Sequence, residues 1–420
     1  MINLIWGLLG PEHLASERRT RTLGLGIAVR TYNDLAVPNL GGVRFTKNVY
    51  LACLGIHIAE EARERGRNVT NIQVSNAIEA LACWLSYENN GWNSDERLRG
   101  NTKLNGKKEL SFKTVSNRDF YVQQPMRMAT VQTLPGLNLV ESKGERFNSY
   151  SLSEHGSEFV QEGLKGYTCY RRKNVGSYLV DWVCGIQNNP VHDGLYRALS
   201  PLNSLPQSAK GILKERLISG NHENDIRRRN ALSWVSNINN KPCTNWDTEP
   251  HELSTSHWKD IKSGAHFFQL RDKAMLLLDT IETQLANSQS GELSPGDQLT
   301  ETLEKALETV KSCADSYINL HHDPSPSKIA TTFAKECLQN TSEAILNSIV
   351  ERDNQVVKLR QGQIVKGPAF NGEQKIPDDD DYDGLFPKGT SYRLWNLNIL
   401  NIDFNDQLED LLESKRSDHE

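Results

Sequence analysis

Lysine and arginine are the residues whose type and spacing point most directly to a chemical role. Residues 101–149 contain eight of them and four acids, whereas the 420-residue chain as a whole has a formal net charge of −5. Clustered cations of this kind neutralise nucleic-acid phosphates, and phosphate contacts dominate non-specific affinity. A local basic patch on an acidic chain predicts one nucleic-acid contact surface rather than a uniformly cationic protein. The eight cations are Lys103, Lys107, Lys108, Lys113, Arg118, Arg127, Lys143 and Arg146.

Histidine is the next residue type that could do chemistry, and the densest cluster is His321-His322-Asp323. Adjacent residues on a helix point about 100° apart, so two neighbouring histidines chelate one metal ion poorly. Pro324 marks a helix end, where histidine is favoured by the helix dipole. The pattern predicts a capping role rather than a metal site.

Alternating acids precede Gly384 in the manner of a calcium-binding loop, with Asp379, Asp381 and Asp383 at its first, third and fifth positions. The twelfth position, which needs a bidentate glutamate, is Thr390. Residues 378–384 are therefore predicted to be an acidic linker, not a calcium site.

Motifs of the common enzyme classes are missing from the sequence. It contains no phosphate-binding loop, kinase motif set, G-x-S-x-G elbow, H-E-x-x-H pair or paired Cys/His zinc spacing. We predict no catalytic residue, no metal site and no cofactor, and a protein that is not an enzyme. A nuclease or hydrolase whose site is assembled only in three dimensions is the third class left open.

The elements that must position the cations surround residues 139–152. Residues 139–141 form a strand pattern, the polar residues 142–146 include the turn former Gly144, and residues 147–152 alternate as a return strand. Ser153 is placed to cap a following helix. Upstream, Pro125 suits a first helical position, and Met126, Ala129 and Leu134 share one helix face.

This order of helix, hairpin and helix, together with the phrase Tyr150-Ser151-Leu152-Ser153-Glu154-His155-Gly156, resembles the winged helix-turn-helix of transcription regulators over residues 103–163. The resemblance implies contact with double-stranded DNA, for which we select Arg127, Gln132, Lys143 and Arg146. Winged helices also serve as protein-docking modules, and this alternative stays open.

Composition bounds the remaining possibilities. Hydrophobic residues make up 37% and charged residues 24%, a globular profile, and no stretch approaches the ~18 apolar residues of a membrane span. The seven cysteines include no C-x-x-C pair, and Cys53, Cys83 and Cys337 lie in apolar helical patterns. Buried free thiols suit a reducing compartment, so we expect a cytoplasmic protein that does not contact membranes.

The predicted fold is mainly α, with a helical N-terminal unit, a winged helix and a C-terminal helical bundle. Apolar periodicity predicts helices over residues 45–65, from a Thr70-x-x-Gln73 capping box to residue 85, and over residues 264–287, 295–317 and 327–349. An apolar island at residues 392–400 is predicted to dock on the body or on a partner. The predicted domains are a helical unit (1–100), a winged helix (101–163), a mixed helical connector (164–256), a helical bundle (257–360), and an acidic linker with an apolar tail (361–420).

These features predict a non-catalytic nucleic-acid-binding or adaptor subunit of a bacterial multiprotein system, with double-stranded DNA and other protein subunits as partners. The alternative is a structural subunit of an ATPase or defence complex, whose winged helix binds protein instead of DNA.

Overall fold

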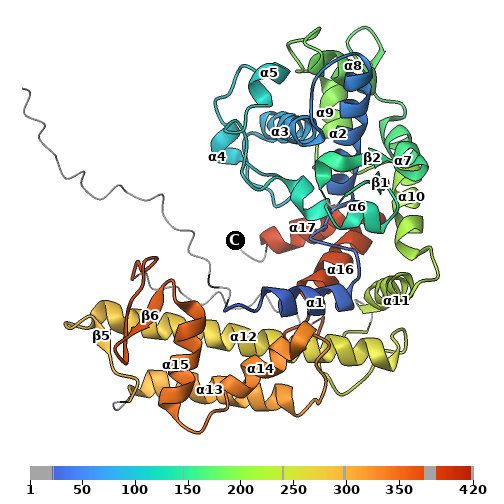
Figure 1. Ribbon diagram of the computed structural model, residues 1–420. Coiled ribbons are helices and arrows are strands. Elements are labelled where there is room, and N and C mark those ends of the chain that lie inside the picture. Colours follow the sequence, from blue (N-terminus) through green and yellow to red (C-terminus); the bar gives the residue numbers. More distant parts are fainter. Residues whose placement is uncertain are drawn as a thin grey trace, which may run out of the picture. The chain divides into compact units, whose positions relative to one another are not determined.

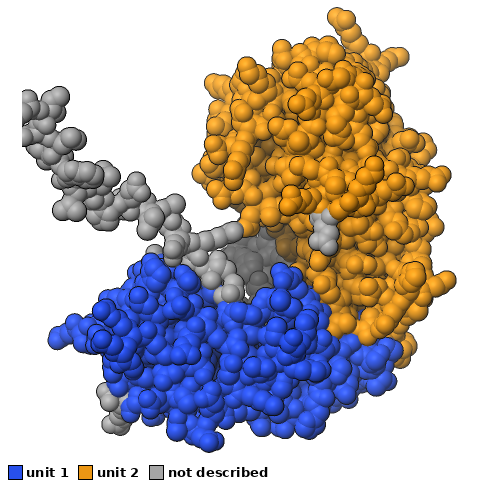
Figure 2. All heavy atoms as spheres, viewed as in Figure 1, with its two compact units in different colours: residues 1–33, 242–249, 254–391 blue, residues 34–241, 250–253, 392–420 orange. Residues whose placement is uncertain are grey.

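The fold is mainly helical, as predicted, with 58% of residues in helices and 5% in strands (Figure 1). The computed structural model describes residues 21, 23–144, 146–238, 241–296, 299–372 and 385–417. It forms two compact units, coloured separately in Figure 2. Unit 1 comprises Met1–Asn33, Pro242–Glu249 and Ser254–Ser391, and unit 2 comprises Asp34–Lys241, Pro250–Leu253 and Tyr392–Glu420. The predicted boundaries after residues 100 and 163 both fall inside unit 2.

Unit 2 is built around an αα-hairpin, α2 (Thr46–Glu64) and α3 (Asn71–Asn90). The predicted capping box is present: Thr70 accepts from the Gln73 N–H, and the Gln73 side chain accepts from the Thr70 N–H. The two helices approach so closely at Gly55 that a Cβ there would lie 2.1 Å from Ser75 Oγ. Any larger residue at position 55 would force the helices apart.

The other elements of unit 2 pack around this hairpin. Helix α16 (Tyr392–Phe404) contacts α2, α10 (Gln207–Ile218) and α11 (Glu223–Ile238), so the predicted apolar island is buried within unit 2. The remaining elements are α4 (Asn101–Leu104), α5 (Phe112–Val115), η1 (Met126–Thr130), α6 (Thr133–Gly136), β1 (Val140–Ser142), η2 (Phe147–Ser149), β2 (Tyr150–Leu152), α7 (Glu154–Leu164), β3 (Thr168–Cys169), β4 (Lys173–Asn174), α8 (Val175–Val183), α9 (Asp193–Leu199) and α17 (Leu408–Ser417).

Unit 1 contains the predicted helical bundle. Its longest helix, α12 (Thr255–Asn287), packs along α13 (Glu301–Ile318), and the third predicted helix is divided into α14 (Ile329–Glu336) and α15 (Ser342–Asp353). A small antiparallel sheet in the order β5 (Glu292–Leu293), β7 (Gln363–Lys366), β6 (Val357–Arg360) was not predicted. The buried Arg21 guanidinium pairs with Asp279 and Glu282 of α12 and with Asp353 of α15.

Two local predictions differ from the structure. Residues 26–36, for which the sequence predicted no helix, form helix α1 (Gly26–Ala36). The single helix expected after Pro125 is instead the 3₁₀ turn η1 followed by the one-turn helix α6. Thr130, Val131 and Thr133 explain the second difference, because β-branched residues disfavour the α-helix and the Thr130 hydroxyl bonds the Arg127 carbonyl.

The second half of the predicted winged helix lies where the sequence places it. Strands β1 and β2 pair antiparallel with Val140 opposite Leu152, and Ser153 caps α7 by accepting from the Gly156 N–H. Residues 147–149, expected to be part of the return strand, form η2 instead. The winged-helix assignment therefore remains a prediction.

None of the helices in the described part of the chain is long and apolar enough to cross a membrane.

The burial of α16 generates a stability test. Leu397 is fully buried, so Leu397→Ala should lower the free energy of unfolding of unit 2 by about 2–5 kcal/mol. Tyr392, 49% exposed on the same helix, provides the control, since Tyr392→Ala should change stability by less than about 1 kcal/mol. Urea unfolding followed by tryptophan fluorescence measures both, and equal midpoints for the two variants would contradict the packing of α16.

Candidate nucleic-acid interface

A run of exposed cations occupies residues 99–118, which we call the basic segment. It holds six Lys or Arg residues and one acid, Glu109. All six cationic side chains are exposed, and none forms an ion pair with a carboxylate of the described residues. A phosphate can therefore bind these cations without first displacing a carboxylate. The six are Arg99, Lys103, Lys107, Lys108, Lys113 and Arg118.

The backbone of the basic segment is held by buried anchors rather than by long helices. Its apolar side chains, Leu104, Leu110, Phe112 and Val115, are buried between the exposed cations. Two indole N–H groups donate to its carbonyl oxygens, from Trp84 to Lys107 (3.0 Å) and from Trp182 to Leu110 (2.9 Å). These two hydrogen bonds hold the backbone from which the exposed cationic side chains extend, because they satisfy carbonyl groups that regular secondary structure leaves unpaired here.

Lys143 and Arg146, two of the four residues selected from the sequence, are exposed at the turn between β1 and β2. The β1–β2 turn is held at the start of α3, where Asn71 donates to the Phe147 and Tyr150 carbonyls, whereas the basic segment is held at Trp84, 13 residues further along the same helix. The hairpin cations therefore form a second patch, separate from the basic segment.

Arg127 is held in internal contacts. Its Nε donates to Asn76 Oδ1 of α3 at 2.5 Å, its backbone N–H donates to Glu79 Oε2 at 3.1 Å, and its guanidinium lies over the Phe147 ring. Burial lowers the pKa of Arg127, and the Glu79 carboxylate partly opposes this effect. The side chain links α3 to η1 and η2.

Gln132, the fourth selected residue, is also engaged within unit 2. Its Oε1 accepts from Arg393 Nη2 at 2.8 Å, and Arg393 is a buried residue of α16. Of the four residues selected from the sequence, Lys143 and Arg146 therefore lie at an exposed turn. Arg127 and Gln132 are instead engaged in tertiary contacts within unit 2. The partners Asn76, Glu79 and Arg393 lie far away in sequence, which is why sequence patterns did not reveal these contacts.

The setting of Arg127 predicts a structural role. Arg127→Ala should lower the free energy of unfolding by about 1–3 kcal/mol, because hydrogen bonds from charged donors are among the stronger ones. DNA affinity of the folded variant should stay within about twofold of native. Urea unfolding and fluorescence anisotropy measure the two effects. A native unfolding midpoint combined with weakened DNA binding would assign Arg127 to the interface instead.

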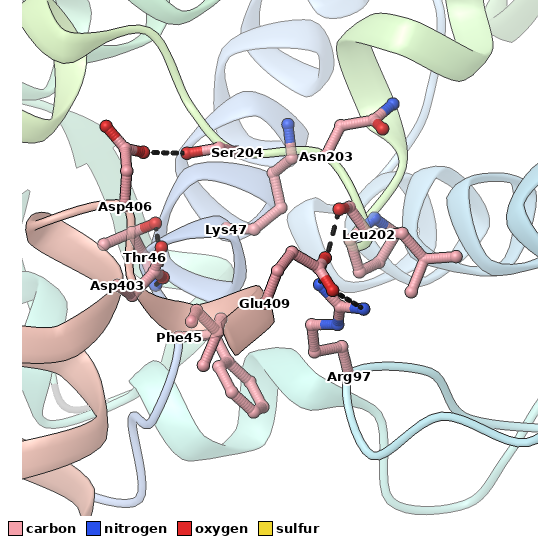
Figure 3. Close-up of a pocket in the computed structure, with 12 residues that line it drawn as sticks. Phe45, Thr46, Lys47, Arg97, Leu202, Asn203, Ser204, Asp403, Asp406 and Glu409 are labelled. Atoms are coloured by element: carbon pink, nitrogen blue, oxygen red, sulfur yellow. Dashed lines mark hydrogen bonds and ion pairs between the residues drawn. The ribbon is translucent and has the colours of Figure 1, made fainter. Parts of the chain in front are cut away.

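A small cavity of about 90 Å³ lies beside the start of α2, and Lys47, Asp403 and Asp406 are among the residues that line it (Figure 3). Asp403 Oδ2 accepts from both the backbone N–H and the hydroxyl of Thr46 at 2.8 Å. Lys210 pairs with Asp406 at 2.6 Å and with Asp403 at 3.4 Å. These contacts join α2, α10 and α16.

Lys47 differs from Lys210 in lacking a carboxylate within ion-pair distance among the described residues. Its Nζ donates to the Ala198 carbonyl at 3.1 Å, and Figure 3 shows the side chain extending toward Asn203 and Ser204. Burial lowers the pKa of Lys47 to about 7, an effect that Asp403 opposes and Lys210 reinforces. A large fraction of the molecules therefore carries a neutral amine here near neutral pH.

The lowered pKa of Lys47 predicts a pH effect on stability. Between about pH 7 and the unfolded-state pKa near 10.4, the unfolded chain binds more protons at this residue, so its contribution to stability rises with pH. The Lys47→Met variant lacks this term. Relative to the variant, the native chain should gain up to about 1.4 kcal/mol per pH unit from about pH 7 to about pH 9. Urea unfolding across that range measures the difference, and parallel pH profiles would contradict it.

The histidine cluster holds structural contacts. His322 Nε2 lies 2.6 Å from Asp260 Oδ1, and Asp323 accepts from the backbone N–H groups of Ser325 and Thr331 at 2.8 Å. Among the residues that the structure describes, no group of three or more His, Cys, Asp or Glu side chains is arranged to hold a metal. The acidic residues 378–384 lie outside the described residues.

Sequence reasoning missed several residues of these sites. Arg99 lies two positions before the window in which the cations were counted, and it extends the basic segment. Lys47 and Asn48 occupy the first turn of α2, where polar residues are usually exposed, yet both are buried. Their burial depends on packing from the C-terminal helices, for which the local sequence carries no signal.

Comparisons of the chain with protein-family models, with curated proteins and with solved structures found no match in any of the three.

Proposed function

We propose that this protein is a non-catalytic nucleic-acid-binding subunit that contacts the phosphate backbone of double-stranded DNA through its basic segment. The observation that supports this function is the set of six exposed cations within residues 99–118, none of which is paired with a described carboxylate. Lys143 and Arg146 at the hairpin turn supply a second point of contact. The placement in a reducing cytoplasm is part of the same proposal and is supported by seven free cysteines.

The form of the basic segment favours backbone contact over base reading. Its two helices, α4 and α5, are four residues long each, too short to lie along a major groove. Four of its six cations are lysines, which bind phosphate as flexible point charges and carry little sequence information. We therefore expect salt-sensitive binding with weak sequence preference.

In the alternative, a purely structural docking subunit, the apolar tail at residues 392–400 would bind a partner protein. That tail is helix α16, and its apolar residues are packed against α2, α10 and α11. The DNA-binding proposal depends on no such element, and protein partners would reach the chain through other surfaces.

The proposal predicts a specific salt dependence. Each phosphate contact contributes about 0.9 to the slope of log affinity against log salt, so Lys107→Ala/Lys108→Ala should reduce the magnitude of that slope by about 2. Fluorescence anisotropy with a labelled duplex at several salt concentrations gives the slope. Affinity at low salt should fall at least tenfold, roughly the loss expected for two contacts.

A matched control removes two lysines that already have acid partners. Lys165 pairs with Glu162 and Lys305 with Glu301, and both lysines are exposed. Lys165→Ala/Lys305→Ala changes the net charge equally and should leave the slope near native. Equal losses in the two double variants would attribute binding to net charge alone, and the absence of native binding at low salt would refute the proposed function.

A further inference from the structure

A cleft of about 380 Å³ lies beside the basic segment. It is bounded by the start of α2, by residues 96–99 and by η1 with the residues before it. This volume falls within the range of about 300–1,000 Å³ typical of small-molecule sites. The lining residues that matter here are Arg44, Asn48, Arg97, Arg99, Met126 and Met128.

The cleft contains one cation that is available for an anionic ligand, and a second whose ion pair with a carboxylate is easily broken. Arg97 is fixed by Asp95 at 2.8 Å and by Glu409. Arg44 pairs with Glu96, and both side chains are about one-third exposed, so the pair is weak and a phosphate can displace the carboxylate. Arg99 has no carboxylate partner among the described residues. A phosphate group can therefore bind Arg99 directly, and it can bind Arg44 by displacing the Glu96 carboxylate.

Asn48 gives the cleft a hydrogen-bonding requirement. The residue is only 9% exposed, and its Oδ1 is buried without a hydrogen-bond partner in the described part of the chain. A buried acceptor left unsatisfied costs about 1–3 kcal/mol. A ligand that donates an N–H to this oxygen removes the penalty, which an ionised carboxylate, an acceptor only, cannot do.

The third component of the cleft is apolar. Met126 and Pro125 are buried at its wall, and Met128 is 52% exposed at its edge. Methionine sulfur makes favourable contacts with aromatic rings and adapts to their shape. A flat aromatic ring with N–H donors and an attached phosphate satisfies all three components together, and a nucleotide has this structure.

We propose that the cleft receives a single unpaired nucleotide of the bound nucleic acid, with its base against Met128 and Asn48 and its phosphate on Arg99. The inference rests on the proposed function, since Arg99 belongs both to the cleft and to the basic segment that holds the neighbouring phosphates. Lys103 follows Arg99 by four residues, close enough for consecutive phosphates of one strand to reach both side chains. An acidic protein segment fits less well because aspartate and glutamate side chains offer no aromatic ring to the methionine edge of the cleft.

The test compares three fluorescein-labelled duplexes of the same sequence: fully paired, with one extra unpaired adenosine, and with an abasic residue in place of that adenosine. Native protein should bind the adenosine duplex about five- to tenfold more tightly than the other two. The abasic duplex bends as easily but lacks the base, so it separates base recognition from flexibility.

Variants assign the preference to the cleft. Arg99→Ala and Asn48→Leu should each reduce the ratio to about one, while Lys107→Ala/Lys108→Ala should weaken binding to all three duplexes and preserve the ratio. Should Asn48→Leu fail to fold, Met128→Glu at the exposed edge replaces it. Equal, salt-sensitive affinity of the native protein for the three duplexes would overturn the cleft inference and leave the proposed function intact.

Two further outcomes complete the test. Binding to none of the duplexes would refute both proposals. Competition by a polyglutamate peptide that Arg99→Ala abolishes, without any preference among the duplexes, would identify the cleft as a site for acidic protein and overturn the nucleotide inference.

Discussion

The backbone N–H groups at the start of α2 are the constraint on which unit 2 depends. Helix α2 is buried along most of its length, so these groups cannot be hydrated, and its N-cap residue, Phe45, offers no side-chain acceptor. Asp403 fills this role from α16, and the buried Lys210 balances its charge. Removing the Asp403 carboxylate would leave the start of α2 uncapped. It would also remove one of the two carboxylates that pair with the buried Lys210 ammonium group.

The same constraint positions the small cavity at Lys47 and the larger cleft at Asn48. Phe45 lies between them and lines each one, and Arg97 is shared as well, fixed in place by Glu409 of α17. Lys47 faces the smaller cavity and Asn48 the larger cleft because they are consecutive residues of a helix whose start is fixed. The candidate site is therefore supported by the C-terminal helices as much as by the residues that line it.

Local patterns predicted the regular helices well. The capping box at Thr70, the helix over residues 45–65 and the cap at Ser153 depend on contacts within a few residues, and each is present. The helix expected after Pro125 failed because β-branched residues outweighed the apolar spacing. The sequence identified the cations as a group. It could not distinguish Arg127 and Gln132, which make internal contacts, from Lys143 and Arg146, which are exposed. The partners of Arg127 and Gln132, Asn76 and Arg393, are 51 and 261 residues away.

The interleaving of the two units has a consequence for how the protein is made. Residues 34–241 leave the ribosome before residues 254–391, the main part of unit 1, are synthesised, yet the carboxylate that caps α2 arrives only with residue 403. Because domains fold as units during synthesis, the helices of unit 1 can assemble while α2 still lacks its cap and the hydrophobic surface that α16 covers is open to solvent. For the time needed to translate some 160 residues, at roughly 5–20 residues per second, the nascent chain carries this exposed surface, and a chaperone has its opportunity to bind there.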